Sequence, residues 1–201
     1  MKKDFLETKE RDVNTYVSLY CASKFFLNNG VQKRSGCFYN FSASLTYVAF
    51  AFEAFINHIG SHVFSDWSEK DKTIKEQHKR IGAVLDELKI NPDRSKRPWQ
   101  TLSSLLKYRR KIAHGRSEKL YKENLITQAT YEHNENDPLG DHFFISTEWE
   151  KYCTEKNAKR AIEDVTEIMI FIDKKARENH HFEYPLFNPG MQSGEIKKIG
   201  V

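Results

Sequence analysis

The residues best suited to chemistry in this chain of 201 residues are Arg109 and His114, which stand five positions apart in segment 108–115. Histidine is the side chain that exchanges protons near neutral pH, so it can act as a general acid or base. The planar guanidinium of arginine binds a carboxylate or a phosphate through two parallel hydrogen bonds. These two residue types therefore point to proton transfer beside a bound anion.

The position of Arg109 within its predicted helix is unusual. At 100° per residue, one helix face collects five apolar residues, and Arg109 projects onto the middle of that face. The five are Leu102, Leu105, Leu106, Ile112 and Ala113. A buried guanidinium is costly unless it is paired, so Arg109 needs a carboxylate, a phosphate or a subunit interface. His114 points about 140° away, but two copies of the helix across a twofold axis would bring both pairs into one cleft.

Arg109-x4-His114, followed by Gly115 at the end of a helix in a small helical protein, resembles the R-x4-6-H motif of HEPN domains (higher eukaryotes and prokaryotes nucleotide-binding). The resemblance extends to the apolar helix from Phe38 to His62 and to a long helix near the C-terminus, and covers roughly residues 36–178. One position departs from the family pattern. The residue after the arginine is often Asn or another small polar group, whereas here it is Arg110.

The resemblance implies a metal-independent endoribonuclease that works as a homodimer, with a composite site where the helices bearing Arg109 and His114 meet. His114 would perform acid/base catalysis, and Arg109 would hold the scissile phosphate while the 2′-hydroxyl attacks, leaving a 2′,3′-cyclic phosphate. No metal ion and no cofactor are expected. The resemblance also implies a toxin or antiviral defence effector that acts on RNA, with an antitoxin protein as a further partner.

Glu53 is a second anomaly, because this carboxylate lies inside the apolar run 48–56. A buried carboxylate requires a partner, and Arg109 is the obvious candidate. Such a pair would either orient the guanidinium for catalysis or only fix the register of two helices. Asn57, one helical turn after Glu53, is expected to join the same network.

Basic residues concentrate around the suspected site. Residues 70–122 hold 16 Lys or Arg and 6 Asp or Glu, a net charge of +10 that leaves −6 for the rest of a chain whose total is +4. Such a patch would attract a phosphate-bearing substrate, although it could equally be a solvated face. Within it, Arg110 is expected to contact a phosphate, whereas Lys111 and Arg116 would attract RNA without regard to sequence.

Other sites have less support in the sequence. His58 and His62 have the i, i+4 spacing of zinc ligands but lack the glutamate of HExxH and a nearby third ligand, so no metal site is predicted. Walker A, GxGxxG and GxSxG motifs are missing. The three cysteines are widely spaced and form no CxxC pattern; they are Cys21, Cys37 and Cys153.

Apolar periodicity predicts an all-α, up-and-down bundle of about five main helices, HEPN-like in its arrangement. The expected helices span residues 9–28, 37–62, 68–88, 98–114 and 154–178. Thr147 and Glu150 form a capping box that should open a further short helix. A short hairpin or irregular loop is expected near residues 125–146, and an extended tail over 180–201.

The chain is long enough for one domain with a single core, taken here as residues 9–178 of a domain spanning 1–201. The charged N-terminus does not read as a secretory signal, and the longest apolar stretch, 45–59, is too short to span a bilayer. A cytoplasmic protein with no membrane partner is therefore expected. Two alternatives to the nuclease stay open: a non-catalytic HEPN-like module that binds RNA, a nucleotide or a protein, and a purely structural helical protein.

Overall fold

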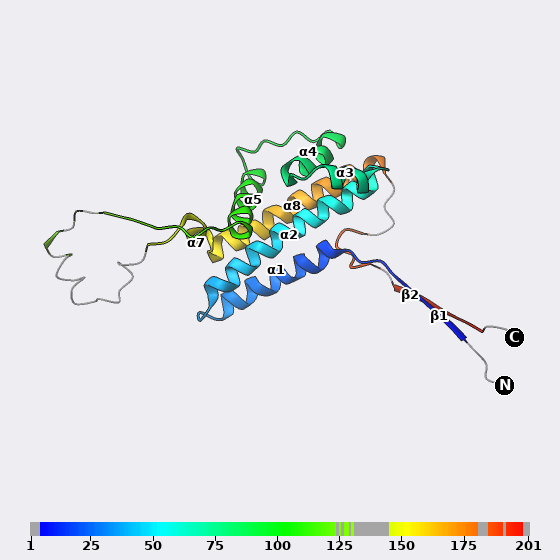
Figure 1. Cartoon of the computed structure of the whole chain (residues 1–201), viewed down its shortest axis with the longest axis horizontal. Helices are drawn as coiled ribbons and strands as arrows, with labels where there is room; N and C mark the ends of the chain where they lie inside the picture. Colours follow the sequence, from blue (N-terminus) through cyan, green and yellow to red (C-terminus); the bar gives the residue numbers. More distant parts are fainter. Residues whose placement is uncertain are drawn as a thin grey trace.

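The computed structural model describes residues 5–123, 125, 127, 128, 130, 145–180, 185–190 and 192–198. The predicted all-α class is confirmed: helices form the body, and one two-stranded ribbon projects from it (Figure 1). The elements follow the order β1 (Phe5–Arg11), α1 (Thr15–Gln32), α2 (Cys37–Val63), α3 (Trp67–Thr73), α4 (Gln77–Glu87), α5 (Trp99–Ala113), α7 (Glu148–Tyr152), α8 (Glu155–Asn179) and β2 (Gln192–Lys198).

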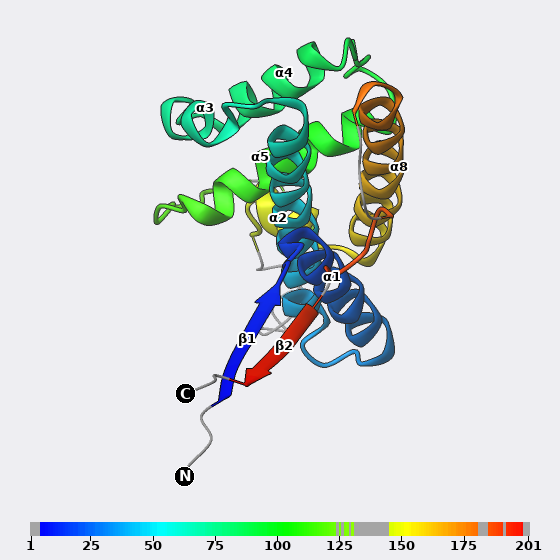
Figure 2. The same cartoon turned by 90° about the vertical axis from the view of Figure 1, so that its right-hand side faces the viewer.

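Helix α2 is the central element, as predicted, because its apolar side chains cover most of its circumference. Helices α1, α3, α4, α5 and α8 all contact it (Figure 2). Its fully buried residues include Leu45, Val48, Phe52, Phe55 and Ile59. Burying one such side chain contributes about 1.5–3 kcal/mol to the stability of the fold. Because many of the core residues lie on α2, this helix makes a large contribution to the core.

Helix α8 forms the opposite wall of the core. The apolar stripe predicted for it is buried, including Ala161, Val165, Met169 and Ile172. The side chain of Thr154 caps its first turn by accepting a hydrogen bond from the Asn157 backbone N–H. The capping box predicted for the preceding short helix, α7, is also confirmed.

The single helix predicted over 68–88 is wrong, because the structure breaks it into α3 and α4. At the break, Arg80 Nε donates a hydrogen bond to the Ile74 carbonyl oxygen at 2.7 Å, and Arg80 Nη1 lies 2.9 Å from Asp71 Oδ1. The arginine side chain thus binds a carbonyl that the interrupted helix no longer engages. Sequence periodicity runs through this position and does not reveal the break.

The first predicted helix is misplaced at both ends. It begins at Thr15 instead of residue 9, because residues 9–11 belong to β1. It also continues past residue 28, through Gly30 to Gln32. A Cβ on Gly30 would lie 2.6 Å from Phe41 Cε1, so this glycine allows α1 to pack closely on α2.

The N-terminal strand was not predicted. Strand β1 pairs antiparallel with β2, from Phe5 opposite Lys198 to Arg11 opposite Gln192, so the predicted extended tail contains a paired strand. Such a ladder joins the two ends of the chain, and a local pattern cannot specify a partner so far away in sequence. The side chain of Asn14 fixes the ribbon to α1 by donating to the Asn188 carbonyl oxygen at 2.9 Å.

The predicted hairpin or loop at 125–146 lies mostly outside the described residues. In the part of the chain that is described, no helix combines the length and apolar character needed to cross a bilayer.

Candidate functional site

Helix α5 carries the candidate catalytic residues, and its buried face differs in detail from the predicted one. The buried residues are Thr101, Leu102, Leu105 and Tyr108, whereas Leu106 and Ile112 are only partly buried. Ala113, expected on the core face, is exposed. The buried stripe is therefore rotated toward Tyr108, and Arg109 lies at its edge, not at its middle.

Arg109 extends from this edge to α2, where it meets Glu53. Arg109 Nη2 donates a hydrogen bond to Glu53 Oε2 at 3.0 Å, and Nε lies 2.8 Å from Oε1. The side chains of Arg109 and Glu53 are 23% and 18% exposed. The guanidinium carbon also stands 5.1 Å from the centre of the Phe50 ring. The predicted partner of Arg109 is confirmed, at a position that solvent still reaches.

The electrostatics of Glu53 reflect this partial burial. Removal from water raises the pKa of its carboxyl group, and the positive charge of Arg109 works against that rise. The neighbouring Gln77 side chain and the charge of Arg80, both from α4, also lower the pKa, but burial remains the largest cause. The carboxylate thus lies where α2, α4 and α5 come together.

Asn57 was expected to join this pair. It is partly buried one turn after Glu53 on α2, but within the described residues no hydrogen bond links it to Glu53 or to Arg109. The structure therefore brings together Glu53 and Arg109 and leaves Asn57 outside their contact.

His114 occupies the C-cap of α5, one residue beyond the last helical residue. Its backbone N–H donates to the Arg110 carbonyl oxygen at 3.1 Å, and its side chain is exposed. Arg109 is engaged by α2 while His114 faces solvent at the helix end, as their angular separation predicts. Among the described residues, one copy of the chain presents one exposed imidazole, that of His114, in this region.

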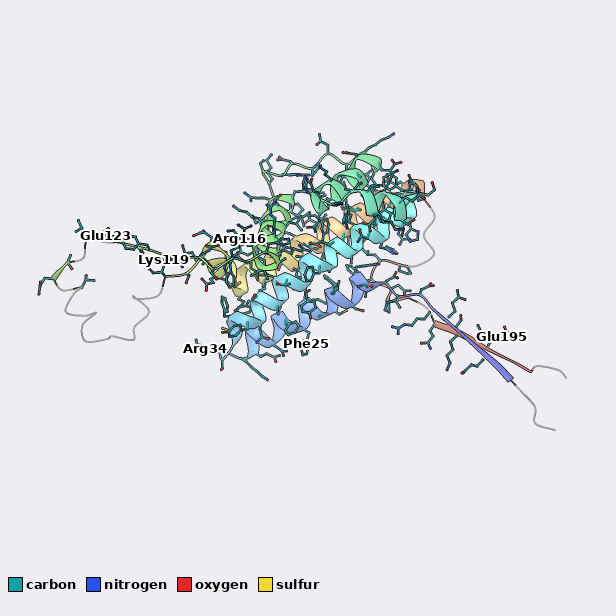
Figure 3. All side chains as sticks on the ribbon, viewed as in Figure 1. Phe25, Arg34, Arg116, Lys119, Glu123 and Glu195 are labelled. Atoms are coloured by element: carbon teal, nitrogen blue, oxygen red, sulfur yellow. The ribbon has the colours of Figure 1, made fainter. Side chains whose placement is uncertain are left out.

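The three supporting cations are all exposed, but they are not equivalent. Lys111 Nζ lies 3.3 Å from Glu118 Oε1, so part of its charge is compensated. Arg110 lies on the outer face of α5. Arg116 follows the helix, on the segment that leads away from the bundle toward Lys119 (Figure 3). These cations surround the His114 end of α5.

Tyr108 is a positioning residue that the sequence reading missed. Its hydroxyl group lies 2.8 Å from Ser42 Oγ, donates to the Ser42 carbonyl oxygen at 3.2 Å and accepts a hydrogen bond from Cys153 Sγ at 3.5 Å. Burial raises the pKa of this tyrosine. These contacts fix α5 to α2 beside Arg109. The burial of Tyr108 could have been predicted from the sequence, because the i, i+4, i+7 spacing of Thr101, Leu105 and Tyr108 puts them on one helix face.

The other end of α5 is fixed by a pair that the sequence reading also missed. Arg97 Nε donates to Asp164 Oδ2 at 2.9 Å, and Arg97 Nη2 donates to Oδ1 at 2.6 Å. The side chain of Asp164 is 3% exposed. Burial favours a higher pKa for Asp164, but hydrogen bonds from Arg97 and Thr101 outweigh it and lower the pKa. The sequence could have indicated this pair, because Asp164 is a carboxylate inside the apolar stripe of α8 and therefore needs a partner.

His58 and His62 lie on α2, away from this region of α5, with ring centres 4.7 Å apart. Burial, assisted by the nearby His62, lowers the pKa of His58 to about 4. The described segments hold no group of three or more His, Cys, Asp or Glu side chains placed to bind a metal ion.

The arrangement can therefore hold an anion near the end of α5 and exchange protons through His114, with Arg109 oriented by Glu53. Comparisons of the chain with protein-family models, with curated proteins and with solved structures found no match.

Proposed function

We propose that this protein is a metal-independent endoribonuclease of the HEPN type. The observation that carries the proposal is the Glu53–Arg109 pair, because it orients a partly exposed arginine side chain five residues before the exposed His114. The exposed cations Arg110, Lys111 and Arg116 support it, since RNA binding depends on phosphate contacts. The R-x4-H resemblance gives these residues their roles.

In the proposed reaction, a base removes the proton of a ribose 2′-hydroxyl, and the 2′-oxygen attacks the adjacent phosphorus. The bond to the 5′-oxygen breaks, that oxygen receives a proton, and a 2′,3′-cyclic phosphate remains on the upstream fragment. His114 moves a proton in these steps, while Arg109 stabilises the charge on the phosphate oxygens. The residues assigned to the reaction use no cofactor.

The proposed active form is a homodimer in which two copies of α5 face each other across a twofold axis. The second His114 then supplies the complementary protonation state that one exposed imidazole cannot provide alone. By the same resemblance, the protein acts as a toxin or antiviral effector that an antitoxin protein restrains.

The test is cleavage of labelled single-stranded RNA and tRNA in excess EDTA. We expect wild-type protein to produce fragments with 2′,3′-cyclic phosphate ends and His114→Ala to produce none. His78→Ala is a matched control, because His78 is also an exposed histidine but lies on α4 near Glu76. A folded dimer that cleaves neither RNA, or cleavage that survives in His114→Ala, would contradict the proposal.

The alternative is a binding module that holds RNA without cutting it. The Glu53–Arg109 pair favours the binding module in one respect. Glu53 already compensates the charge of Arg109 in the free protein, so less of that charge remains to stabilise a reacting phosphate. The module predicts RNA binding without turnover, with equal affinity in wild type and His114→Ala. A purely structural pair instead predicts neither RNA binding nor cleavage, and a loss of folding when Arg109 is removed.

A further inference from the structure

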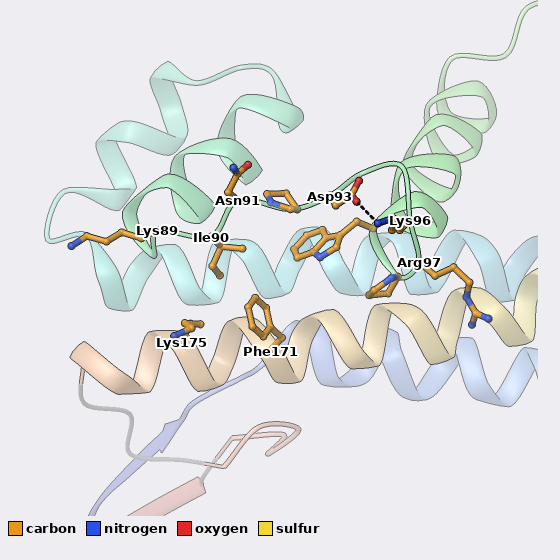
Figure 4. A pocket seen from close by; sticks show the side chains of 11 residues that line it. Lys89, Ile90, Asn91, Asp93, Lys96, Arg97, Phe171 and Lys175 are labelled. Carbon is orange, nitrogen blue, oxygen red and sulfur yellow. Dashed lines mark ion pairs between the residues drawn. The ribbon is translucent and has the colours of Figure 1, made fainter.

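The loop between α4 and α5 borders a hollow that the proposed function does not use. This hollow has a volume of about 390 Å³ and adjoins a second one of about 510 Å³. The two share the loop residues 89–92 as a common wall. Helix α8 closes the first hollow from below with Phe171 and Lys175 (Figure 4). The start of α5 forms its far side, because Trp99 also lines it.

The polar lining is predominantly basic. Lys89 lines both hollows, Lys96, Arg97 and Lys175 line the first, and Arg94 lines the second together with the exposed carboxylate of Asp86. Lys96 lies 3.5 Å from Asp93, and Lys175 lies 2.7 Å from Glu178, so part of their charge is compensated. Lys89 and Arg94 are exposed. Lys89 begins the shared wall and Arg94 follows it in sequence, so both cations border the second hollow, where they would attract an anion.

The apolar part of the lining is aromatic. Phe171 is 42% exposed, and its ring points from α8 toward the loop (Figure 4). Trp99 at the start of α5 is partly buried. An exposed ring next to a row of cations is the combination that binds a base by stacking and a phosphate by charge.

We propose that these adjoining hollows bind a nucleoside phosphate, with the base against Phe171 and the phosphate between Lys89 and Arg94. The ligand is a nucleotide within a single-stranded RNA or a free mononucleotide. The 15 residues of α5 separate this site from His114 by about 22 Å, at about 1.5 Å per residue. An RNA strand bound here would be anchored away from the bond that is cleaved near His114. This anchoring role rests on the proposed function, whereas the binding of a nucleoside phosphate does not.

The test measures binding by the catalytically disabled His114→Ala protein, so turnover does not enter the result. The probes are a labelled single-stranded oligoribonucleotide, followed by fluorescence anisotropy, and ADP, followed by calorimetry. Phe171→Ala should weaken binding by roughly five- to 150-fold, the range for loss of base stacking. Phe171→Trp should restore it. Lys89→Glu with Arg94→Glu should weaken binding and reduce the salt dependence by about one phosphate contact or more.

The matched control is Lys72→Glu with Lys75→Glu, which makes the same charge change at two exposed lysines outside both hollows. Loss of RNA binding alone in the hollow variants identifies a strand site, and loss of ADP binding identifies a mononucleotide site. Equal weakening in the hollow and control variants overturns the inference, as does unchanged binding of both probes in folded Phe171→Ala. Either result leaves the cleavage assay unaffected, so the two proposals fail separately.

Discussion

Arg109 and Glu53 form an ion pair between α5 and α2: Nη2 donates a hydrogen bond to Oε2 at 3.0 Å, whereas Nε lies 2.8 Å from Oε1 without the geometry of a hydrogen bond. Because both side chains retain some exposure, this pair is neither a free surface ion pair nor a sealed core pair. Its removal should therefore cost less than the 3–5 kcal/mol or so typical of a fully buried pair. The difference makes a catalytic role separable from a structural one.

Replacing Arg109 should damage activity more than folding. We expect Arg109→Ala to lower the free energy of unfolding by about 1–3 kcal/mol, between the values for exposed and buried pairs. RNA cleavage should fall at least about 100-fold, the usual loss for one charge-stabilising donor. Arg109→Lys keeps the charge but not the fork, so activity should stay low while folding recovers.

Urea denaturation and the EDTA cleavage assay measure these two effects. Arg34→Ala is the control, since Arg34 is exposed on the turn between α1 and α2 (Figure 3). Full activity in a folded Arg109→Lys protein would show that the fork is not required.

Mixed dimers should reveal whether the site is shared. If both copies of His114 act in one cleft, a single His114→Ala subunit inactivates the dimer that contains it. Cleavage should then fall as the square of the wild-type fraction when the two proteins are mixed and allowed to exchange subunits. A linear fall in an exchanged mixture, or a wild type that sediments as a monomer while cleaving RNA, would exclude the composite site.

The Arg97–Asp164 pair predicts asymmetric losses of stability. Arg97→Ala leaves a nearly inaccessible carboxylate without its partner and should cost about 3 kcal/mol. Asp164→Asn leaves an arginine that is 53% exposed and can be rehydrated, so a clearly smaller loss is expected. Urea titrations at neutral pH give both values. Equal losses in the two variants would refute this account of the pair.

The same pair has a defined pH dependence. The pKa of Asp164 is lower in the folded chain than its ordinary 3.8, so the ionised pair stabilises the fold above that pH. This contribution is lost as the pH falls below about 4, and Asp164→Asn should flatten that part of the stability curve.

His58 should destabilise the protein in mild acid. Its folded pKa of about 4 lies below the ordinary 6.5, so the unfolded chain takes up a proton first as the pH falls. Stability is full above pH 6.5 and falls toward pH 4, by less than about 3.4 kcal/mol at 1.36 kcal/mol per pH unit, because solvent screens the partly exposed imidazole. His62 and Arg177 oppose protonation of His58, and Asp173 favours it.

His58→Gln removes this titration, so the difference in stability between wild type and variant should change across the pH range 4 to 6.5. Thermal unfolding at several pH values provides the measurement. A constant difference would mean that His58 titrates alike in the folded and unfolded chains.

Several features followed from local sequence alone. The apolar residues of α2 and the stripe of α8 have helical periodicity, which is a property of neighbouring residues and needs no knowledge of the fold. The capping box at Thr147 and Glu150 is equally local. The Glu53–Arg109 contact joins residues far apart in sequence, but it was predictable because each is a charge on an apolar helix face and must find a partner.

What the tertiary structure decided depends on contacts between distant segments. The β1–β2 ribbon pairs β1 near the N-terminus with β2 near the C-terminus, and α1 runs on through Gly30, where Phe41 packs too closely for a side chain. The rotation of α5 that buries Tyr108 and leaves Arg109 at the edge is set by Ser42 and Cys153 from other elements. Sequence by itself determined which residues form helices and which charges need partners. Only the packed structure decided how far each charge stays exposed, because exposure depends on what distant segments place over it.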